Sequence, residues 1–226
     1  MVSIDNVYQK VLAFANKEQR GYITPQEFNL FAHQAQLEIF EQYFYDLNQF
    51  LRLPGNSEEY SNIVNNLREK IVVFETTGTI SNNLITTSYA GSSCYRLGTV
   101  TTSDGTIVEE VQPDDNPYTI NSPLLKATSL RPTYIRTGAK SVVVTPATNC
   151  NCTYTRTPIV PRWGYFVVGD KALYDVNSSI DFELHPAEES ELVYKILKYA
   201  GISMRAEDIA RGGGMLETQQ TQQEKQ

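Results

Sequence analysis

The chain changes its sequence pattern twice, and these two changes limit the folds open to it. Through residue 70, apolar residues recur every three or four positions, the period of an amphipathic helix. From 71 to 185, short apolar runs alternate with turn residues, and Thr, Val, Tyr and Ser are abundant, which is typical of a β domain. The helical period returns at Pro186 and ends before a Gln-rich tail. The pattern therefore predicts an α+β fold.

The segment 1–70 is predicted to form an N-terminal helical bundle. A first helix begins at Ser3, a residue type that caps helices, and runs to about residue 18. A long amphipathic helix follows at 24–52, and a shorter one runs from Ser57 to about residue 70. In the long helix, Thr24, Pro25 and Glu27 form a strong start signal, because Thr and Glu three residues apart make a capping box.

The segment 71–185 is predicted to be a central antiparallel β domain, either a sandwich or barrel-like. Its first strand is expected to begin at Ile71-Val72-Val73-Phe74, and a hairpin turn is expected at Ser103-Asp104-Gly105. The other predicted strands are 95–100, 106–108, 134–136, 141–144, 163–168, 173–175 and 180–184, with a loop at 112–117.

The segment 186–211 is predicted to be a C-terminal helix that packs on the N-terminal helices. Pro186 suits the first turn, Gly201 suits the C-terminal cap, and one more turn is expected before residue 211. Residues 212–226 have too little apolar surface to fold alone. We expect them to be a flexible docking tail, with a hinge and contact residues at Gly212, Gly213, Gly214, Met215 and Leu216.

Composition excludes several functional classes. The 226 residues carry a net charge of −7. Sequence-independent binding of nucleic acid needs clustered Lys and Arg side chains that contact phosphates, and no such cluster stands out in the sequence. No run of about eighteen apolar residues exists, so no transmembrane helix is predicted. Residues 1–9 contain Asp5 and no basic residue, and we expect no secretory signal peptide.

No constellation of residues predicts an enzyme, a metal site or a cofactor site. Cys94 stands alone, and Cys150 and Cys152 form one close pair without the second pair that structural zinc sites use. We interpret them as reduced cysteines in a strand region. His33 lies in the long helix and His185 at the entry to the last one. The acid pairs Asp114-Asp115 and Glu188-Glu189 have structural explanations, as loop charge and as partners of a helix dipole.

Other features favour an assembly component. The long helix is apolar over a wide arc, and we expect it to contact a neighbouring subunit through Phe40, Tyr43, Phe44 and Leu47. The β region is low in charge and rich in Thr, Ser, Asn and Tyr, which suits a polar contact surface. Instead of forming an interface, the long-helix residues could belong to an ordinary hydrophobic core. Instead of docking, the tail could be a disordered segment without a partner.

Both ends of the chain resemble virion structural proteins of tailed bacteriophages, particularly crAss-like podoviruses. Near the N-terminus the resemblance lies in Val7-Tyr8, Asn16-Lys17-Glu18-Gln19-Arg20-Gly21-Tyr22-Ile23-Thr24-Pro25-Gln26-Glu27-Phe28-Asn29 and Ala35-Gln36. Near the C-terminus it lies in Phe182-Glu183-Leu184-His185-Pro186, Glu191-Leu192-Val193, Ile196-Leu197, Ala200-Gly201-Ile202 and the Gln-rich tail. The β region matches nothing specific.

This resemblance implies a head-to-tail connector, an adaptor or ring protein seated beneath the portal. Such adaptors form twelvefold homo-oligomeric rings that line the genome ejection channel, and a C-terminal arm docks on the portal. The partners implied are other copies, the portal, neighbouring tail or ring proteins, and genomic DNA that passes without specific binding. The implied location is the head-tail junction of the virion, assembled in the host cytoplasm, with no membrane partner.

Two alternatives remain open. The chain could be another virion component, namely a tail-tube, gatekeeper or minor head protein. It could instead be a surface- or glycan-binding module, in which Trp163, Tyr165 and the Tyr- and Thr-rich strands present an aromatic platform.

Overall fold

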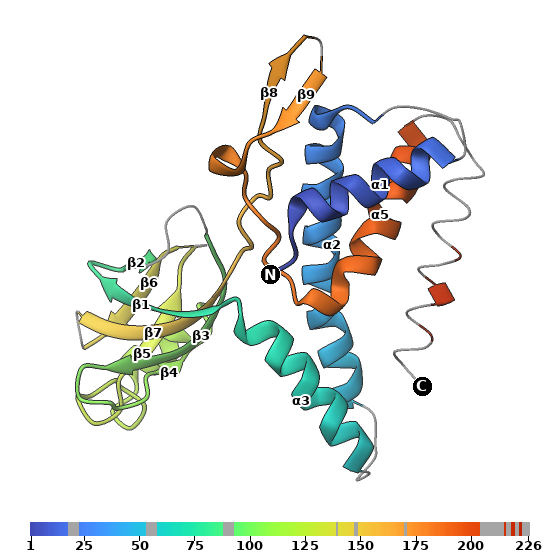
Figure 1. The fold of residues 1–226 in the computed structure, drawn as a ribbon. Coiled ribbons are helices and arrows are strands. Elements are labelled where there is room, and N and C mark those ends of the chain that lie inside the picture. Colours follow the sequence, from blue (N-terminus) through green and yellow to red (C-terminus); the bar gives the residue numbers. More distant parts are fainter. Residues whose placement is uncertain are drawn as a thin grey trace. The chain divides into compact units, whose positions relative to one another are not determined.

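The computed structural model describes residues 1–17, 23–52, 58–87, 93–138, 140–146, 149–169 and 171–203, together with 215, 218, 219 and 222. The chain divides into two units. A helical unit consists of residues 1–73 and 158–226, and a β unit consists of residues 74–157. Helices together with largely antiparallel sheets confirm the predicted α+β class (Figure 1).

Four helices make up most of the described helical unit. They are α1 (Ile4–Lys17), α2 (Pro25–Arg52), α3 (Glu58–Val72) and α5 (Glu189–Ser203), and a short 3₁₀ turn, η2 (Pro186–Glu188), precedes α5. Helix α2 packs against α3 and α5, and α1 packs against α5 (Figure 1). The three N-terminal helices lie where the apolar spacing predicted them. No helix among the described residues is long and apolar enough to cross a membrane.

The start of α2 has the predicted capping box. The backbone N–H of Glu27 donates to Thr24 Oγ1 at 3.3 Å, and the Thr24 N–H donates to Glu27 Oε2 at 3.0 Å. The Thr24 hydroxyl also donates to Glu27 Oε2 at 2.8 Å. These bonds satisfy N–H groups that have no partner inside the helix. They also lower the pKa of the Glu27 carboxyl, because the bonds from Thr24 favour its charged form.

Two predicted boundaries are wrong. Ile71 and Val72 do not begin a strand, because they form the last residues of α3, where Ile71 is buried and continues the helical spacing. Gly201 does not cap the last helix, which runs two residues further, to Ser203. Gly201 is buried inside α5, so it occupies a packed position of the helix rather than its end. The extra turn predicted at Ala206 to Arg211 lies outside the described residues.

The segment 158–185 was predicted to complete the β domain, but it belongs to the helical unit. It contains a hairpin, β8 (Tyr165–Val168) and β9 (Lys171–Tyr174), and a 3₁₀ turn, η1 (Val176–Ser178). The predicted strand 180–184 forms only single bridges, including Phe182 to Val2. The alternating pattern predicts extended backbone, and it does not specify which element that backbone will join.

A buried polar network holds the start of this segment on α2. The amide of Gln36, which is fully buried, donates to the carbonyl of Ile159 at 2.7 Å. Glu183 accepts from the Ile159 N–H at 2.8 Å, and its own N–H donates to Gln36 Oε1 at 3.2 Å. These long-range bonds explain why the segment leaves the β unit.

The described residues of the β unit form two open sheets and no closed barrel. One has four strands in the order β2-β1-β7-β3, and the other has three in the order β4-β5-β6. The strands are β1 (Glu75–Ser81), β2 (Leu84–Thr87), β3 (Cys94–Thr102), β4 (Glu109–Glu110), β5 (Thr133–Arg136), β6 (Val142–Thr145) and β7 (Asn149–Arg156). The pairs are antiparallel except β4 with β5, which is parallel.

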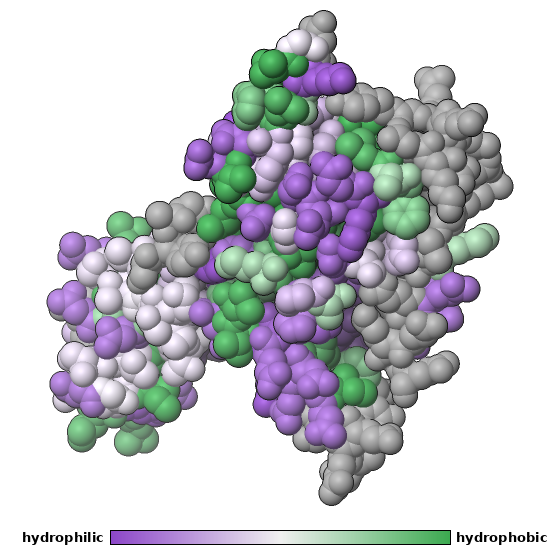
Figure 2. All heavy atoms as spheres, viewed as in Figure 1, coloured by the Kyte–Doolittle hydropathy of each residue, from purple (hydrophilic) through white to green (hydrophobic). Residues whose placement is uncertain are grey.

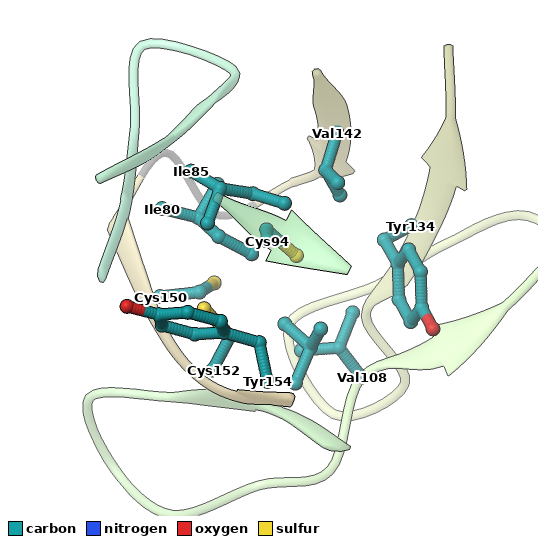
Figure 3. Close-up of a cluster of buried hydrophobic side chains, with 10 residues drawn as sticks. Ile80, Ile85, Cys94, Val108, Tyr134, Val142, Cys150, Cys152 and Tyr154 are labelled. Carbon is teal, nitrogen blue, oxygen red and sulfur yellow. The ribbon is translucent and has the colours of Figure 1, made fainter. Parts of the chain in front are cut away.

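Both sheets contribute to one apolar core, shown in Figure 3. Its residues are Ile80, Ile85, Cys94, Val100, Val108, Tyr134, Val142, Cys150, Cys152 and Tyr154. Every second residue of β7 from Cys150 to Tyr154 points into it, and the intervening Asn and Thr side chains are exposed. The three cysteines are free thiols on strands β3 and β7, as predicted, and the structure adds that they are buried as small apolar core residues.

Turn chemistry closes the β1–β2 hairpin and the turn after β3. Asn82 and Asn83 both have positive φ, the conformation of a two-residue hairpin turn that matches strand twist. Gly105 also has positive φ, at 86°, and its N–H donates to the Thr102 carbonyl at 3.0 Å. The predicted turn at 103–105 is therefore confirmed. The predicted loop at 112–117 instead contains the start of a short helix, α4 (Asn116–Asn121).

Candidate functional site

His33 and His185, the two histidines of the chain, lie on α2 and immediately before η2. Among the residues that the structure describes, no group of three or more His, Cys, Asp and Glu side chains is arranged to hold a metal ion. His185 caps the turn before α5, because its Nδ1 accepts from the Ala187 N–H at 3.2 Å. His33 lies on α2, where its Nδ1 is buried without a hydrogen-bond partner in the described part of the chain.

The two acid pairs occupy different environments. Asp114 and Asp115 are exposed before α4. Glu188 is buried and lies 2.5 Å from the ammonium of Lys70, on α3, and Glu189 forms an exposed ion pair with Lys10, on α1, at 2.8 Å. The second pair therefore ties the start of α5 to two other helices. This is a structural role, more specific than the predicted partnership with a helix dipole.

A further cluster of charges lies along α5. The ammonium of Lys195, which is 1% exposed, lies 3.3 Å from Glu38 Oε1 and 3.5 Å from Glu191 Oε1. The Tyr199 hydroxyl donates to the same Glu38 carboxylate. Because a buried ammonium needs compensating charge, this cluster positions α5 on α2. Its members join two helices, α2 and α5.

The predicted subunit-interface residues separate into two groups. Phe40 and Tyr43 are buried within the helical unit, where the Lys70 ammonium lies 5.5 Å from the Tyr43 ring centroid. Phe44 and Leu47 are half-buried, and the Phe44 ring meets Phe40 edge-on at 5.1 Å. The buried pair belongs to the core of the chain itself, and of the four predicted residues only Phe44 and Leu47 retain exposed surface.

The predicted tail residues Gly212, Gly213, Gly214 and Leu216 lie outside the described residues. Met215 is described, and its side chain is exposed.

Trp163 does not present an aromatic platform. Its side chain is 2% exposed, and its ring packs on Tyr8 at 4.4 Å, Tyr174 at 5.7 Å and Tyr165 at 5.8 Å between centroids. Its indole Nε1 donates to Asp5 Oδ1 at 3.0 Å. A carbohydrate ring needs an open aromatic face, so this tryptophan does not support the glycan-binding alternative.

Trp163 instead anchors the base of the β8–β9 hairpin. The Trp163 N–H donates to Asn29 Oδ1 at 2.7 Å, and the Asn29 amide donates back to the Trp163 carbonyl at 3.3 Å. The Gln26 amide donates to the Tyr165 hydroxyl at 3.4 Å. These contacts attach the hairpin near the N-terminal end of α2, beyond which it extends (Figure 1).

The other side of the hairpin base is also closely packed. The Gly164 N–H donates to Ser179 Oγ at 2.9 Å, and the Asp175 N–H donates to the Gly164 carbonyl at 2.9 Å. A Cβ atom on Gly164 would lie 2.8 Å from the Ser178 backbone carbon, which explains why glycine occupies this position. The base is thus fixed by bonds from α2 on one side and from Asp175 and Ser179, which flank η1, on the other.

The hairpin itself exposes apolar side chains. Phe166, Val167 and Val168 are 50%, 64% and 56% exposed, and Leu173 and Val176 are exposed as well. Figure 2 shows apolar atoms gathered over this hairpin. The sequence pattern predicted both strands, but alternation alone did not reveal that they lie outside the core. The apolar run YFVV gave no signal of this exposure, because an uninterrupted apolar run is typical of a fully buried strand.

A second exposed apolar region lies in the β unit, between β4 and β5. Helix α4 buries none of its residues, and Tyr118, Leu124 and Leu130 are all strongly exposed. Exposed apolar side chains gathered in one region often mark an interaction site. This region and the hairpin are the two candidate interaction surfaces.

No protein-family model matches this chain, and no curated protein matches it significantly.

Proposed function

We propose that this chain is a virion structural protein, a head-to-tail connector ring that joins the portal to the tail and lines the genome ejection channel. The observation that carries an assembly role is the apolar β8–β9 hairpin, which is held rigidly at its base and exposed along its length. Exposed apolar surface of this kind marks interaction sites. The phage-specific part of the proposal rests on the resemblance of the two chain ends.

The charge of the chain suits a channel that DNA must pass through. The net charge is −7, and like charges keep a DNA backbone from adhering to the wall. A wall rich in Lys and Arg would instead hold the phosphates through counterion release. The proposal therefore needs no specific DNA contact.

The helical unit and the tail would take different partners. Phe44 and Leu47 keep part of their surface on α2, where neighbouring copies would pack side by side in a ring. We propose that the tail, residues 212–226, docks on the portal, with the exposed Met215 among its contacts.

The decisive experiment is quantitative mass spectrometry of purified phage particles that contain this chain, with the portal as the internal standard. Equal copy numbers of this chain and the portal are expected, because both would occupy rings of the same symmetry. A copy number several-fold lower or higher, or absence from the particle, would overturn the connector. It would favour a tail-tube, minor head or non-virion protein instead.

A further inference from the structure

We propose that Gly98 and Thr153 form a register lock in the β unit, which decides whether Leu97 faces the core or the opposite side of the sheet. The lock is the contact in which the Thr153 hydroxyl bonds the backbone of Thr99, beside a residue that has no side chain. It acts within one chain and does not depend on the proposed assembly role.

Strand β3 contains more residues than the stretch of β7 with which it pairs, because its register shifts twice. The pairs on either side of the second shift are Leu97 with Tyr154 and Val100 with Cys152. Between these pairs, Gly98 and Thr99 of β3 lie opposite the single residue Thr153 of β7. Two residues opposite one make a β-bulge, which interrupts the ladder of backbone hydrogen bonds.

Both ends of β3 are fixed, so the extra residues have to be accommodated between them. Just before the strand, the Thr157 N–H donates to the Ser93 carbonyl at 2.9 Å, and the Ser93 N–H donates to Thr157 Oγ1 at 3.0 Å. Towards the other end, the Val108 N–H donates to the Val100 carbonyl at 2.9 Å. The bulge can therefore change its place along β3, but it cannot disappear.

The place of the second bulge decides the side that Leu97 takes. Residues directly opposite each other share a face, so Leu97 lies on the face of the buried Tyr154 and packs against the core. If the extra residue came before Leu97, that side chain would lie opposite Thr155, on the other face. Because Leu97 is only partly buried, its packing separates the two alignments by a modest free energy.

The Thr153 hydroxyl provides what core packing leaves undecided. The Thr99 N–H donates to Thr153 Oγ1 at 2.9 Å, and the same hydroxyl donates to the Thr99 carbonyl at 3.4 Å. A hydroxyl is both donor and acceptor, so it replaces the N–H and C=O that an opposite residue offers in a regular ladder. These two bonds form only when Thr99 lies within the bulge.

Gly98 leaves the space that this hydroxyl needs. A Cβ atom at position 98 would lie 2.7 Å from Thr153 Oγ1 and 3.1 Å from the Thr153 carbonyl oxygen. The first of these distances is well inside ordinary non-bonded contact, so a side chain here would displace the hydroxyl from Thr99. Glycine and threonine therefore act as a pair.

The test removes the hydroxyl from the full chain. Thr153→Val keeps the branched shape that strands favour, and Thr153→Ser keeps the hydroxyl. The matched control is Thr79→Val on β1, because Thr79 is exposed and pairs with Asn151, which shares the exposed face of β7 with Thr153. Far-ultraviolet circular dichroism and thermal melts confirm that each variant is folded.

Hydrogen exchange of the Thr99 amide, followed by NMR, reports the bond to the hydroxyl. We expect exchange roughly fivefold faster in Thr153→Val, the net effect of one hydrogen bond, and exchange at the wild-type rate in Thr153→Ser and Thr79→Val. Gly98→Ala should accelerate exchange to a similar extent with the hydroxyl present. Wild-type exchange in Thr153→Val, or equal acceleration in Thr79→Val, would overturn the lock. If Thr153→Val does not fold, wild-type exchange in Gly98→Ala would overturn it equally.

Replacing Leu97 separates the lock from core packing. In Leu97→Thr the side chain no longer favours the core, so the bonds to Thr99 select the alignment. NMR contacts between backbone protons of opposite residues identify that alignment. Residue 97 is expected to stay opposite Tyr154 in Leu97→Thr, and Gly98 is expected to take that place once Thr153→Val is added. An unchanged alignment in the combined variant, or a shift in Leu97→Thr alone, would show that other contacts place the bulge and would overturn the lock.

Discussion

Thr24 illustrates how much one side chain contributes at the residue scale. It caps α2 through three hydrogen bonds with Glu27 and lowers the pKa of that carboxyl. We expect Thr24→Ala to lower the free energy of unfolding at pH 7 by about 1 kcal/mol. Urea unfolding followed by circular dichroism measures this difference.

The same variant has a defined pH dependence. The Glu27 pKa is lower in the folded chain, so its contribution is present above the ordinary carboxyl pKa and is lost as the pH falls through the lowered value. The stability difference between wild type and Thr24→Ala should therefore shrink in acid. A difference that stays constant from pH 7 to pH 3 would contradict the charged capping box.

The buried thiols make a second residue-scale prediction. Burial raises the pKa of Cys152 to about 11, and the neighbouring Cys94 and Cys150 add to the shift. Relative to an ordinary thiol, the thiolate fraction at pH 8 then falls roughly 200-fold. We expect Ellman's reagent to find almost no reactive thiol in the native chain and three after denaturation. Rapid reaction of the native chain would contradict the core position.

At the level of secondary-structure elements, ion pairs hold α5 against the other helices. Lys195 is 1% exposed and lies between Glu38 and Glu191, whereas Lys10 forms an exposed pair with Glu189. Breaking a buried pair leaves an uncompensated charge, whereas exposed pairs contribute little.

We therefore expect unequal effects from the same substitution at these two lysines. Lys195→Met keeps the apolar stem and should lower the free energy of unfolding by about 3 kcal/mol, and Lys10→Met by less than about 1 kcal/mol. Denaturant titration of the far-ultraviolet helical signal measures both. Similar small losses would show that the Lys195 cluster does not hold α5.

The strand-like patterns of segment 158–185 predicted its backbone conformation but not the unit to which it belongs. The hairpin of β8 and β9 and the bridges of segment 180–184 were predicted as extended backbone, and they are extended. Their membership of the helical unit depends on contacts such as Gln36 with Ile159 and Asn29 with Trp163. These residues are more than a hundred positions apart in sequence, and local spacing carries no information on such pairs.

In the whole molecule, the β unit is one continuous stretch of sequence, and it divides the sequence of the helical unit into two parts. The two ends of the β unit lie side by side. The Arg156 N–H donates to the Phe74 carbonyl at 2.9 Å, and Glu75 pairs with Thr155. Paired residues on antiparallel strands have Cα atoms about 5 Å apart. The β unit is thus arranged as an inserted domain.

We expect residues 74–157 to be replaceable by a short Gly-Ser linker without loss of the helical unit. The linker needs to span only about 5 Å, and the helical unit keeps its own buried residues on α1, α2 and α5. Helical circular dichroism with a cooperative thermal transition is the expected result. Loss of that transition would show that the helical unit depends on the insertion for folding.

Spacing and cap chemistry were enough to predict the four long helices, the capping box of α2, the change to extended backbone and the reduced cysteines of the strand region. These features depend on neighbours within a few positions, where spacing and cap chemistry act directly. Contacts between distant segments place Phe40 and Tyr43 in the core, make Trp163 an anchor, and leave the adjoining hairpin exposed. A side chain's exposure depends on distant segments packed over it, and apolar residues in a core and on an exposed hairpin are the same residue types.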